Sequence, residues 1–240
     1  MSRTPAISAL LAGLTALLIA KAEAQVKLVL PKFEAEPFRD CDTCPTMLTL
    51  PSGLQISQAP VTRGEFSAFV SATGFSREGW GCNWNYAHIE QTDDHPVVCV
   101  TFLDAEKYAG WLSERTGHSY RLPTVEEMRY AAMGNESGNY WWGQAVGSNR
   151  ANCAACGSQW DGTSTSPVGA FDSNPFGLKD AVGNVWIWTS DCREGSCDER
   201  KLIGGSWSSP PGDLRITKVI WNEVDVPFNT YGIRVVREER

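Results

Sequence analysis

The residues of this sequence whose spacing could do chemistry are its eight cysteines. Six of them form three close pairs, with the patterns C-x2-C, C-x2-C and C-x4-C. These pairs are Cys41 and Cys44, Cys153 and Cys156, and Cys192 and Cys197. Closely spaced thiolates can bind zinc or soft Cu(I), exchange with other thiols, or close as disulfides. The remaining residues, Cys82 and Cys99, are the fourth candidate pair.

The N-terminus favours one of these chemistries, because it predicts export. Arg3 is followed by an apolar run over residues 6–20 and by a small-residue cleavage pattern over residues 22–24. This order of features predicts a signal peptide over residues 1–24. The alternative is an uncleaved membrane anchor, although the run is shorter than the roughly 20 residues that a spanning helix needs. No later stretch is apolar enough to cross a bilayer, so we expect a periplasmic or secreted protein with no membrane span after cleavage.

In an exported chain, an even number of cysteines favours disulfides over a zinc site. We therefore expect each close pair to be a disulfide, with Cys82 bonded to Cys99. Each short bridge closes a small loop, so it staples local structure more than it restrains the whole chain. Spacing alone leaves the connectivity open, because eight cysteines allow on the order of 100 pairings.

Composition and charge limit which fold classes and which binding partners are possible. The formal net charge is −7 and no basic run is present, which argues against nucleic acid or an anionic membrane as the main partner. Residues 134–207 are rich in Gly, Asn, Ser and Asp, yet the sequence carries ten tryptophans. Because tryptophan brings large buriable area, we expect one compact, monomeric domain with little regular structure. We place it over residues 41–237, after a lead-in over residues 25–40.

Three segments carry the signals of helix starts. Each has a threonine followed three positions later by an acidic residue, which is the pattern of a capping box. The threonines are Thr62, Thr101 and Thr124. Gly74 and Gly117 are the expected stops of the first two helices, and the third is expected to run through Ala132. The strand candidates are residues 46–50, 185–189 and 231–237.

Eight segments, in order, resemble the sulfatase-modifying factor (formylglycine-generating enzyme) family. They are Pro60-Val61-Thr62, residues 95–100 (HPVVCV), residues 120–127 (YRLPTVEE), residues 167–171 (PVGAF), residues 174–180 (NPFGLKD), residues 183–188 (GNVWIW), Gly204-Gly205-Ser206-Trp207 and Tyr231-Gly232-Ile233-Arg234. The resemblance extends from about Cys41 to Arg237. It implies an irregular α+β domain related to the C-type-lectin fold, poor in regular structure, which agrees with the composition.

The resemblance also implies an activity, and this sequence departs from it at the decisive positions. Oxidase members of the family hold copper between two cysteines, spaced C-x4-C just after the Gly-Gly-Ser motif, and convert a sulfatase cysteine to formylglycine. Here those positions are Ser209 and Leu214, neither of which binds soft copper. Cys192 and Cys197 have the spacing of the copper pair but precede the motif, so we expect a loop disulfide. A genuine formylglycine-generating oxidase is therefore the least favoured interpretation.

Two further metals belong to the family. A branch that makes sulfur–carbon bonds with non-haem iron needs an extra helical domain and a histidine-rich motif, so we exclude it for a chain with three histidines. Calcium is a candidate structural cofactor. The resemblance implies a site made by the side chain of Asp180 and the carbonyls of Gly183 and Val185, with Ile187 where the family has a glutamate. Calcium takes six to eight oxygens, so waters would complete that shell; the alternative is that Asp180 caps a turn.

The family's substrate pocket implies a set of lining residues that combine aromatic planes, hydroxyls and guanidinium groups. They are Trp186, Ser206, Trp207, Ser209, Arg215, Thr230 and Arg234. Such a surface suits a peptide, protein or glycan ligand. For Trp186 and Arg234 the alternative interpretation is a purely structural role in the core. The sequence identifies no catalytic residues.

Two hypotheses follow, and whether the protein is an enzyme stays open. The first is an exported protein that acts on or binds a peptide or peptide-like substrate without copper, because some periplasmic relatives that lack the copper pair are linked to siderophore maturation. The second is a non-catalytic protein- or glycan-binding module on a lectin-like fold.

Overall fold

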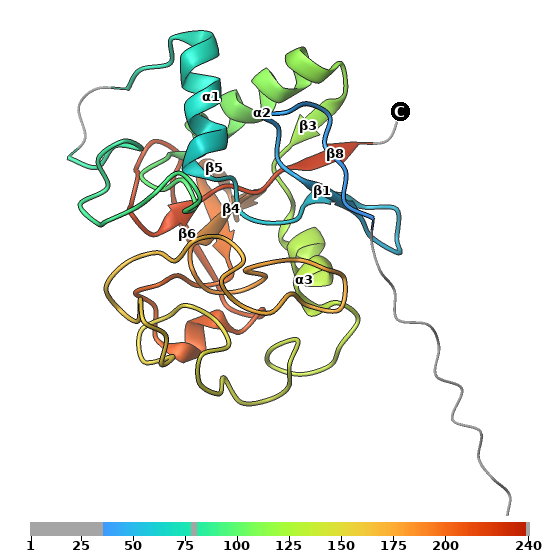
Figure 1. The fold of residues 1–240 in the computed structure, drawn as a ribbon, viewed down its shortest axis with the longest axis vertical. Coiled ribbons are helices and arrows are strands. Elements are labelled where there is room, and N and C mark those ends of the chain that lie inside the picture. The colour runs from blue at the N-terminus through green and yellow to red at the C-terminus, as the bar shows by residue number, and fades with distance from the viewer. Residues whose placement is uncertain (1–35, 78–80, 239–240) are drawn as a thin grey trace, which may run out of the picture. The chain divides into compact units, whose positions relative to one another are not determined.

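The computed structural model describes residues 36–77 and 81–238. The predicted signal peptide and the lead-in up to residue 35 lie outside the described residues. The elements in chain order are β1 (Met47–Thr49), β2 (Gln55–Ser57), α1 (Arg63–Thr73), α2 (Phe102–Thr116), β3 (Ser119–Arg121), α3 (Val125–Met133), β4 (Trp186–Arg193), β5 (Ser196–Ile203), a 3-10 helix (Pro211–Leu214), β6 (Val219–Glu223), β7 (Tyr231–Gly232) and β8 (Val236–Glu238). The long segment between α3 and β4 contains no helix or strand (Figure 1). Within the described ranges, no helix combines the length and the hydropathy that a membrane span requires.

The three α-helices begin where the sequence predicts. In each, the threonine hydroxyl accepts a hydrogen bond from the backbone N–H of the acidic residue three positions later, and that residue's carboxylate accepts from the threonine N–H. These reciprocal bonds satisfy donors that a first helical turn leaves free. Each helix ends at a glycine in the left-handed conformation. These glycines are Gly74, Gly117 and Gly134.

The strands form two small sheets. The first is antiparallel, with the order β1-β2-β8-β3. The second has the order β6-β5-β4-β7, in which β4 and β7 are parallel. Because β8 lies between β2 and β3, the last strand of the chain is needed to complete the first sheet.

The segment 231–237, predicted as one strand, is divided between the two sheets. Tyr231 and Gly232 pair with β4, whereas Val236 pairs with β2 and β3. Apolar alternation along a segment does not reveal which neighbour each residue pairs with, so the pattern predicted extended backbone but not the change of sheet.

The described part of the lead-in already belongs to the domain. The backbone of Phe38 exchanges hydrogen bonds of 3.0 and 2.8 Å with Met47. The Tyr120 hydroxyl donates to the Asp40 carboxylate at 2.5 Å. The folded domain therefore begins upstream of Cys41.

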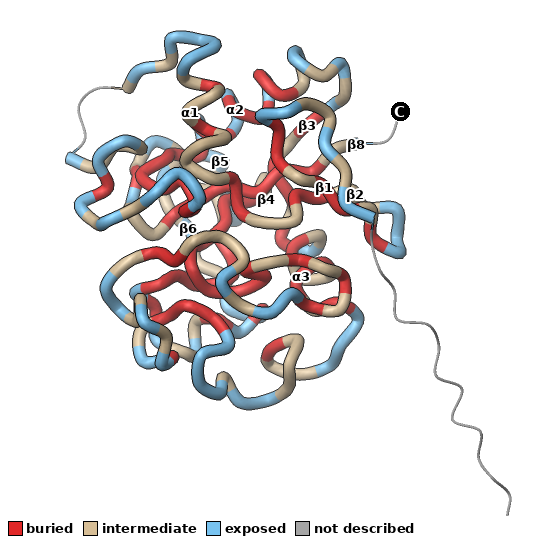
Figure 2. Tube along the Cα trace, in the orientation of Figure 1, coloured by how far each residue is buried: buried red, intermediate tan, exposed pale blue. Residues whose placement is uncertain are grey.

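The first four residues of β4 are buried (Figure 2), and their side chains reach two hydrophobic clusters. Trp186 and Trp188 pack into the cluster that contains the buried side chains of α1 and α2. Ile187 points to the other cluster, which contains α3 and residues of the irregular segment. Adjacent residues of a strand face opposite sides, so one strand links both cores. The fully buried Trp188 indole donates to the Val100 carbonyl at 3.1 Å, as a buried indole N–H requires.

The four predicted disulfides are all present. Cys41–Cys44, Cys82–Cys99, Cys153–Cys156 and Cys192–Cys197 have Cα–Cα distances of 5.0, 5.3, 5.2 and 4.6 Å. The last bridge joins β4 to β5 at their hairpin, so this C-x4-C pair is a staple as predicted. All eight cysteines are used, which leaves no thiol to bind a metal.

Candidate functional site

Ser209, the first of the two positions at which the family resemblance predicts a copper ligand, forms part of a tight turn. Its hydroxyl oxygen lies 3.0 Å from that of Ser206 and accepts from the Ser206 N–H at 3.1 Å. The Ser209 N–H donates to the Ser206 carbonyl at 3.0 Å, and its own carbonyl accepts from Ala154 at 2.9 Å. Both serines are buried. The turn therefore presents a closed pair of hydroxyls where the oxidases present a thiolate.

The second copper position, Leu214, belongs to the hydrophobic core. It ends the 3-10 helix and has no exposed surface. Its Cδ1 lies so close to Gly205 that a Cβ added to this glycine would stand 2.7 Å away. Since Gly205 also has a φ of +77°, only glycine fits beside the leucine. A hydrocarbon side chain thus fills this position.

Trp207 and the segment before β7 form the aromatic part of the site. The Trp207 indole donates to the Asn229 carbonyl at 2.9 Å, and its backbone N–H donates to Asn184 at 2.9 Å. The Trp186 N–H donates to the Thr230 carbonyl at 2.8 Å. These bonds bring the segment 206–209 and the start of β4 to the same stretch of backbone at Asn229 and Thr230. The predicted residues Ser206, Trp207, Ser209, Trp186 and Thr230 therefore lie near one another. Within this set, Trp186 is a core side chain.

The two predicted arginines do not join this group in the same way. Arg215 is exposed beside the 3-10 helix. Arg234 is fully buried, and its guanidinium donates to the carbonyls of Ser57 (2.9 Å), Asp180 (2.8 Å) and Lys179. Burial lowers the pKa of Arg234 to about 10, and the nearby Asp180 opposes that shift. Arg234 therefore remains charged and holds three backbone carbonyls in place. This is the structural role named as the alternative above, and the buried side chain does not line a pocket.

Two of the three predicted calcium donors, Asp180 and Gly183, already accept hydrogen bonds within the protein. The Asp180 carboxylate accepts from the Gly169 N–H at 2.6 Å and lies 3.5 Å from the Asn184 amide nitrogen. The Gly183 carbonyl accepts from the Val185 N–H at 2.7 Å. Burial raises the pKa of Asp180, while the bond from Gly169 and the charge of Arg234 act in the opposite direction.

This arrangement does not fit calcium. A calcium shell needs six to eight oxygens, and Ile187, at the family's glutamate position, is buried in the core. A guanidinium cation already lies near the carboxylate. Asp180 instead stabilises the turn that holds Asn184, whose amide exchanges hydrogen bonds of 2.9 and 3.1 Å with the backbone of Ser166.

A hollow next to Trp207 was not predicted from the sequence. A cavity of about 330 Å³ is lined by Asn229, whose carbonyl accepts from the Trp207 indole, and by the three residues before it. Its wall includes His88, Cys82 and Phe228, and the Phe228 ring is 47% exposed. Tyr86, which is 64% exposed, packs against His88 with ring centroids 4.3 Å apart. We call Tyr86, His88 and Phe228, together with the largely buried Trp207 whose indole bonds to Asn229, the aromatic surface. Scattered single aromatics carried no motif, so no pattern in the sequence could have grouped them.

Known proteins resemble this chain in sequence and in fold. A family profile described as "Sulfatase-modifying factor enzyme 1-like domain" matches residues 20–239. The chain is 29% identical over 195 residues to a formylglycine-generating enzyme of Mycobacterium tuberculosis, covering 56% of this chain and 62% of that protein. It is 34% identical over 166 residues to the inactive C-alpha-formylglycine-generating enzyme 2 of Bos taurus, covering 61% of this chain and 51% of that protein. The chain thus spans about half to three fifths of the length of these relatives.

Among solved structures, PvdO from Pseudomonas aeruginosa superimposes with a TM-score of 0.77 at 27% sequence identity, covering 87% of this chain and 100% of that chain. The predicted fold class is confirmed: an irregular α+β domain related to the C-type-lectin fold.

Proposed function

The chain belongs to the sulfatase-modifying factor family, and we propose that it is an exported member that holds a peptide or peptide-like ligand and makes no formylglycine with copper. The ligand would lie at the Ser206–Ser209 turn and the aromatic surface beside it. Fold alone does not specify activity, so the proposal rests on the residues of the site.

The observation that carries the proposal is the content of the two copper positions. A Cu(I) site in this family requires two thiolates, and soft copper has little affinity for a hydroxyl or a methyl group. The Ser209 hydroxyl accepts from the Ser206 N–H and lies 3.0 Å from the Ser206 hydroxyl, and Leu214 is packed against Gly205. The similarity to a relative described as inactive supports the same conclusion.

Ligand binding is supported by the aromatic surface. Indole and phenyl rings supply large contact area at low entropic cost, and binding sites use them with a few placed polar groups. Here the Trp207 indole is fixed by Asn229, and the exposed hydroxyl of Ser208 lies 3.4 Å from that of Ser206. Backbone and hydroxyl groups of this kind suit the amides of a peptide.

Export is supported by the disulfides. Four bridges use every cysteine, and such bridges persist in oxidising compartments, either the periplasm or the extracellular space.

Two assays test the proposal. In the first, purified protein is incubated with copper, oxygen and a cysteine peptide that carries the sulfatase motif, and the mass of the peptide is then measured by mass spectrometry. We expect no formylglycine above a no-protein control. Formylglycine above that control refutes copper-free function.

The second assay recovers bound species from the exported fraction of cells that carry the wild type, Trp207→Leu or Trp221→Leu. Trp221, which lies on β6 outside the aromatic surface, is the control; it is 49% exposed, whereas Trp207 is 9% exposed, so thermal unfolding must show that both variants are folded. We expect peptide-like species to be lost with Trp207→Leu alone. Equal recovery from all three proteins argues against the assigned site.

A second candidate function is a non-catalytic module that binds a protein or glycan. The exposure of Tyr86 and Phe228 favours it, because large exposed aromatics cluster at recognition surfaces. The recovered species decide between the two: a covalently altered peptide supports an enzyme, and an unaltered protein or glycan supports the module.

A further inference from the structure

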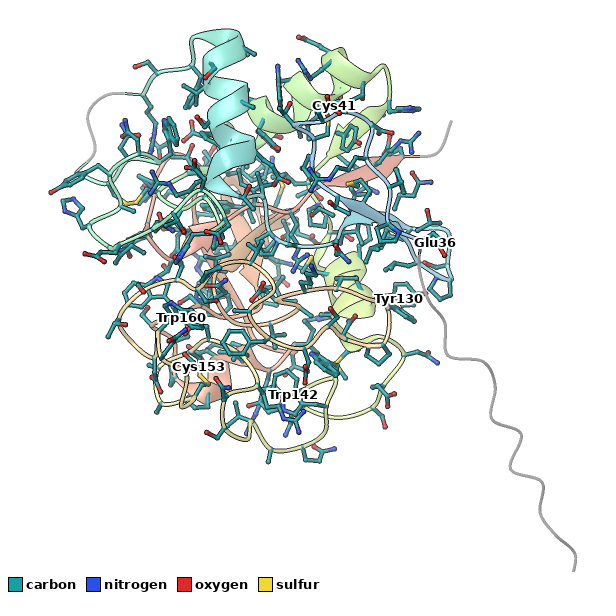
Figure 3. All side chains as sticks on the ribbon, viewed as in Figure 1. Glu36, Cys41, Tyr130, Trp142, Cys153 and Trp160 are labelled. Atoms are coloured by element: carbon teal, nitrogen blue, oxygen red, sulfur yellow. A yellow bond between two sulfur atoms is a disulfide. The ribbon has the colours of Figure 1, made fainter. Side chains whose placement is uncertain are left out.

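A second cavity, of about 520 Å³, lies away from the residues assigned above. The start of α1 contributes Arg63, residues 89–95 contribute Glu90, Gln91 and His95, and the irregular segment contributes Trp160. Figure 3 shows Trp160 on the same part of the irregular segment as Cys153. The cavity volume is in the range of small-ligand sites.

The wall of this cavity carries two opposite charges that do not pair with each other. Neither Arg63 nor Glu90 belongs to any ion pair within 4.0 Å in the described residues. Arg63 donates from Nη1 to the Gln91 carbonyl at 3.3 Å, and its Nε is buried without a partner. Glu90 is exposed and Arg63 is partly buried. Both signs are therefore available to a bound molecule.

The remaining polar groups keep the wall fixed and otherwise uncharged. The His95 Nδ1 lies 2.9 Å from the Thr165 hydroxyl, and burial lowers the pKa of His95, with Asp94 opposing and Arg63 adding to that shift. The Gln91 amide nitrogen donates to the Pro96 carbonyl (3.0 Å) and to Thr165 (2.9 Å), while its Oε1 is buried and unpartnered. Neither unpartnered atom, Arg63 Nε or Gln91 Oε1, has appreciable accessible surface, so neither is offered to a molecule in the cavity.

Trp160 supplies a positioned aromatic face. Its backbone N–H donates to the Ser158 hydroxyl at 3.2 Å, and its carbonyl accepts from the Thr163 N–H at 3.0 Å and hydroxyl at 2.9 Å. The ring contacts Phe171 edge-on, with centroids 6.1 Å apart. A ring held in this way loses little entropy when a hydrocarbon or aromatic group packs against it.

We propose that this cavity binds a small zwitterion, an amino acid or dipeptide, with its carboxylate at Arg63, its ammonium at Glu90 and its side chain against Trp160. A guanidinium matches a carboxylate in geometry and charge. A dianion such as phosphate would meet the Glu90 carboxylate, and a simple cation would meet Arg63, so a molecule with both charges fits best. This site is independent of the function proposed for the Ser206–Ser209 turn.

The test measures binding of L-phenylalanine and glycyl-L-phenylalanine to the purified protein by calorimetry. L-phenylalanine amide, which lacks the carboxylate, and N-acetyl-L-phenylalanine, which lacks the ammonium, are the matched probes. We expect L-phenylalanine amide and N-acetyl-L-phenylalanine each to bind at least about tenfold more weakly than L-phenylalanine, because each lacks one of the two charged contacts. Binding of neither zwitterion at millimolar concentration overturns the proposal.

Variants assign the contacts. Arg63→Gln and Glu90→Gln should each weaken binding of L-phenylalanine at least about tenfold, and Arg63→Lys should retain part of it. Arg150→Gln is the control, because Arg150 is half-exposed and its nearest carboxylate, on Asp172, is 4.0 Å away. Circular dichroism and thermal unfolding confirm that each variant is folded. Unchanged affinity in folded Arg63→Gln and Glu90→Gln refutes the assignment.

Discussion

The hydroxyl oxygens of Ser206 and Ser209 lie 3.0 Å apart and close a buried turn. The turn is held further by the bond from the Ser206 N–H to the Ser209 hydroxyl. Because the hydroxyl of each serine is used inside the protein, neither is available as a ligand for a soft metal.

Replacing both copper positions should create copper affinity. Ser209→Cys with Leu214→Cys supplies the two thiolates that Cu(I) prefers, at a stability cost of about 2 kcal/mol for shortening a core leucine. Cu(I) affinity is measured by competition with a chromogenic chelator. Ser208→Cys with Leu214→Cys is the matched control, because Ser208 is exposed and one residue away. Equal affinity in the wild type would contradict the copper-free assignment.

Removing the buried guanidinium should destabilise the fold. Arg234→Met leaves the carbonyls of Ser57, Lys179 and Asp180 without their donor and the Asp180 carboxylate without a nearby cation. We expect a loss of about 3–5 kcal/mol in the free energy of unfolding, measured with denaturant. Arg215→Met, at an exposed position, should change it by less than about 0.5 kcal/mol. A small effect of Arg234→Met would favour a ligand-binding role for that side chain.

Calcium removal should leave stability unchanged. The Asp180 carboxylate bonds to Gly169, and the Gly183 carbonyl bonds to Val185, so an ion has few free oxygens to bind. The thermal midpoint is compared after dialysis against EGTA and after addition of calcium chloride. A bound ion stabilises the folded state by mass action, so a midpoint that rises with calcium concentration would show that a site exists.

Acid should weaken the protein partly through Glu127. Burial raises the pKa of Glu127, but its bonds to Arg121 (2.6 and 2.8 Å) and to the Thr124 N–H (2.7 Å) outweigh burial and lower it below 4.5. An unfolded state that binds more protons makes stability rise with pH. The contribution of Glu127 is therefore present above about pH 4.5 and is lost as pH falls through the lower folded pKa.

Glu127→Gln should flatten the fall in unfolding free energy as the pH drops below 4.5, while glutamine still fits a capping box. The exposed Glu136→Gln is the control. If both variants keep the wild-type slope, the Arg121–Glu127 pair does not supply the acid sensitivity.

The amino-acid sequence by itself determined the features that depend on near neighbours. A threonine and an acidic residue three positions apart predicted each helix start, because a capping box closes within one turn. Three of the four disulfides join cysteines at most five residues apart. The absence of cysteine from the two positions at which the resemblance predicts copper ligands, Ser209 and Leu214, was also visible, since it concerns residue types at fixed positions.

Only the tertiary structure decided what distant residues do for each other. Arg234 is a buried clamp because the chain brings Ser57 and Asp180 to it across separations of 177 and 54 residues. Asp180 serves a turn because Gly169 and Arg234 surround its carboxylate. The aromatic surface and the cavity between Arg63 and Trp160 likewise join segments far apart in the chain. Such sites arise from long-range packing, which leaves no periodic trace in the sequence, so residue patterns identified the family while side-chain contacts assigned the roles.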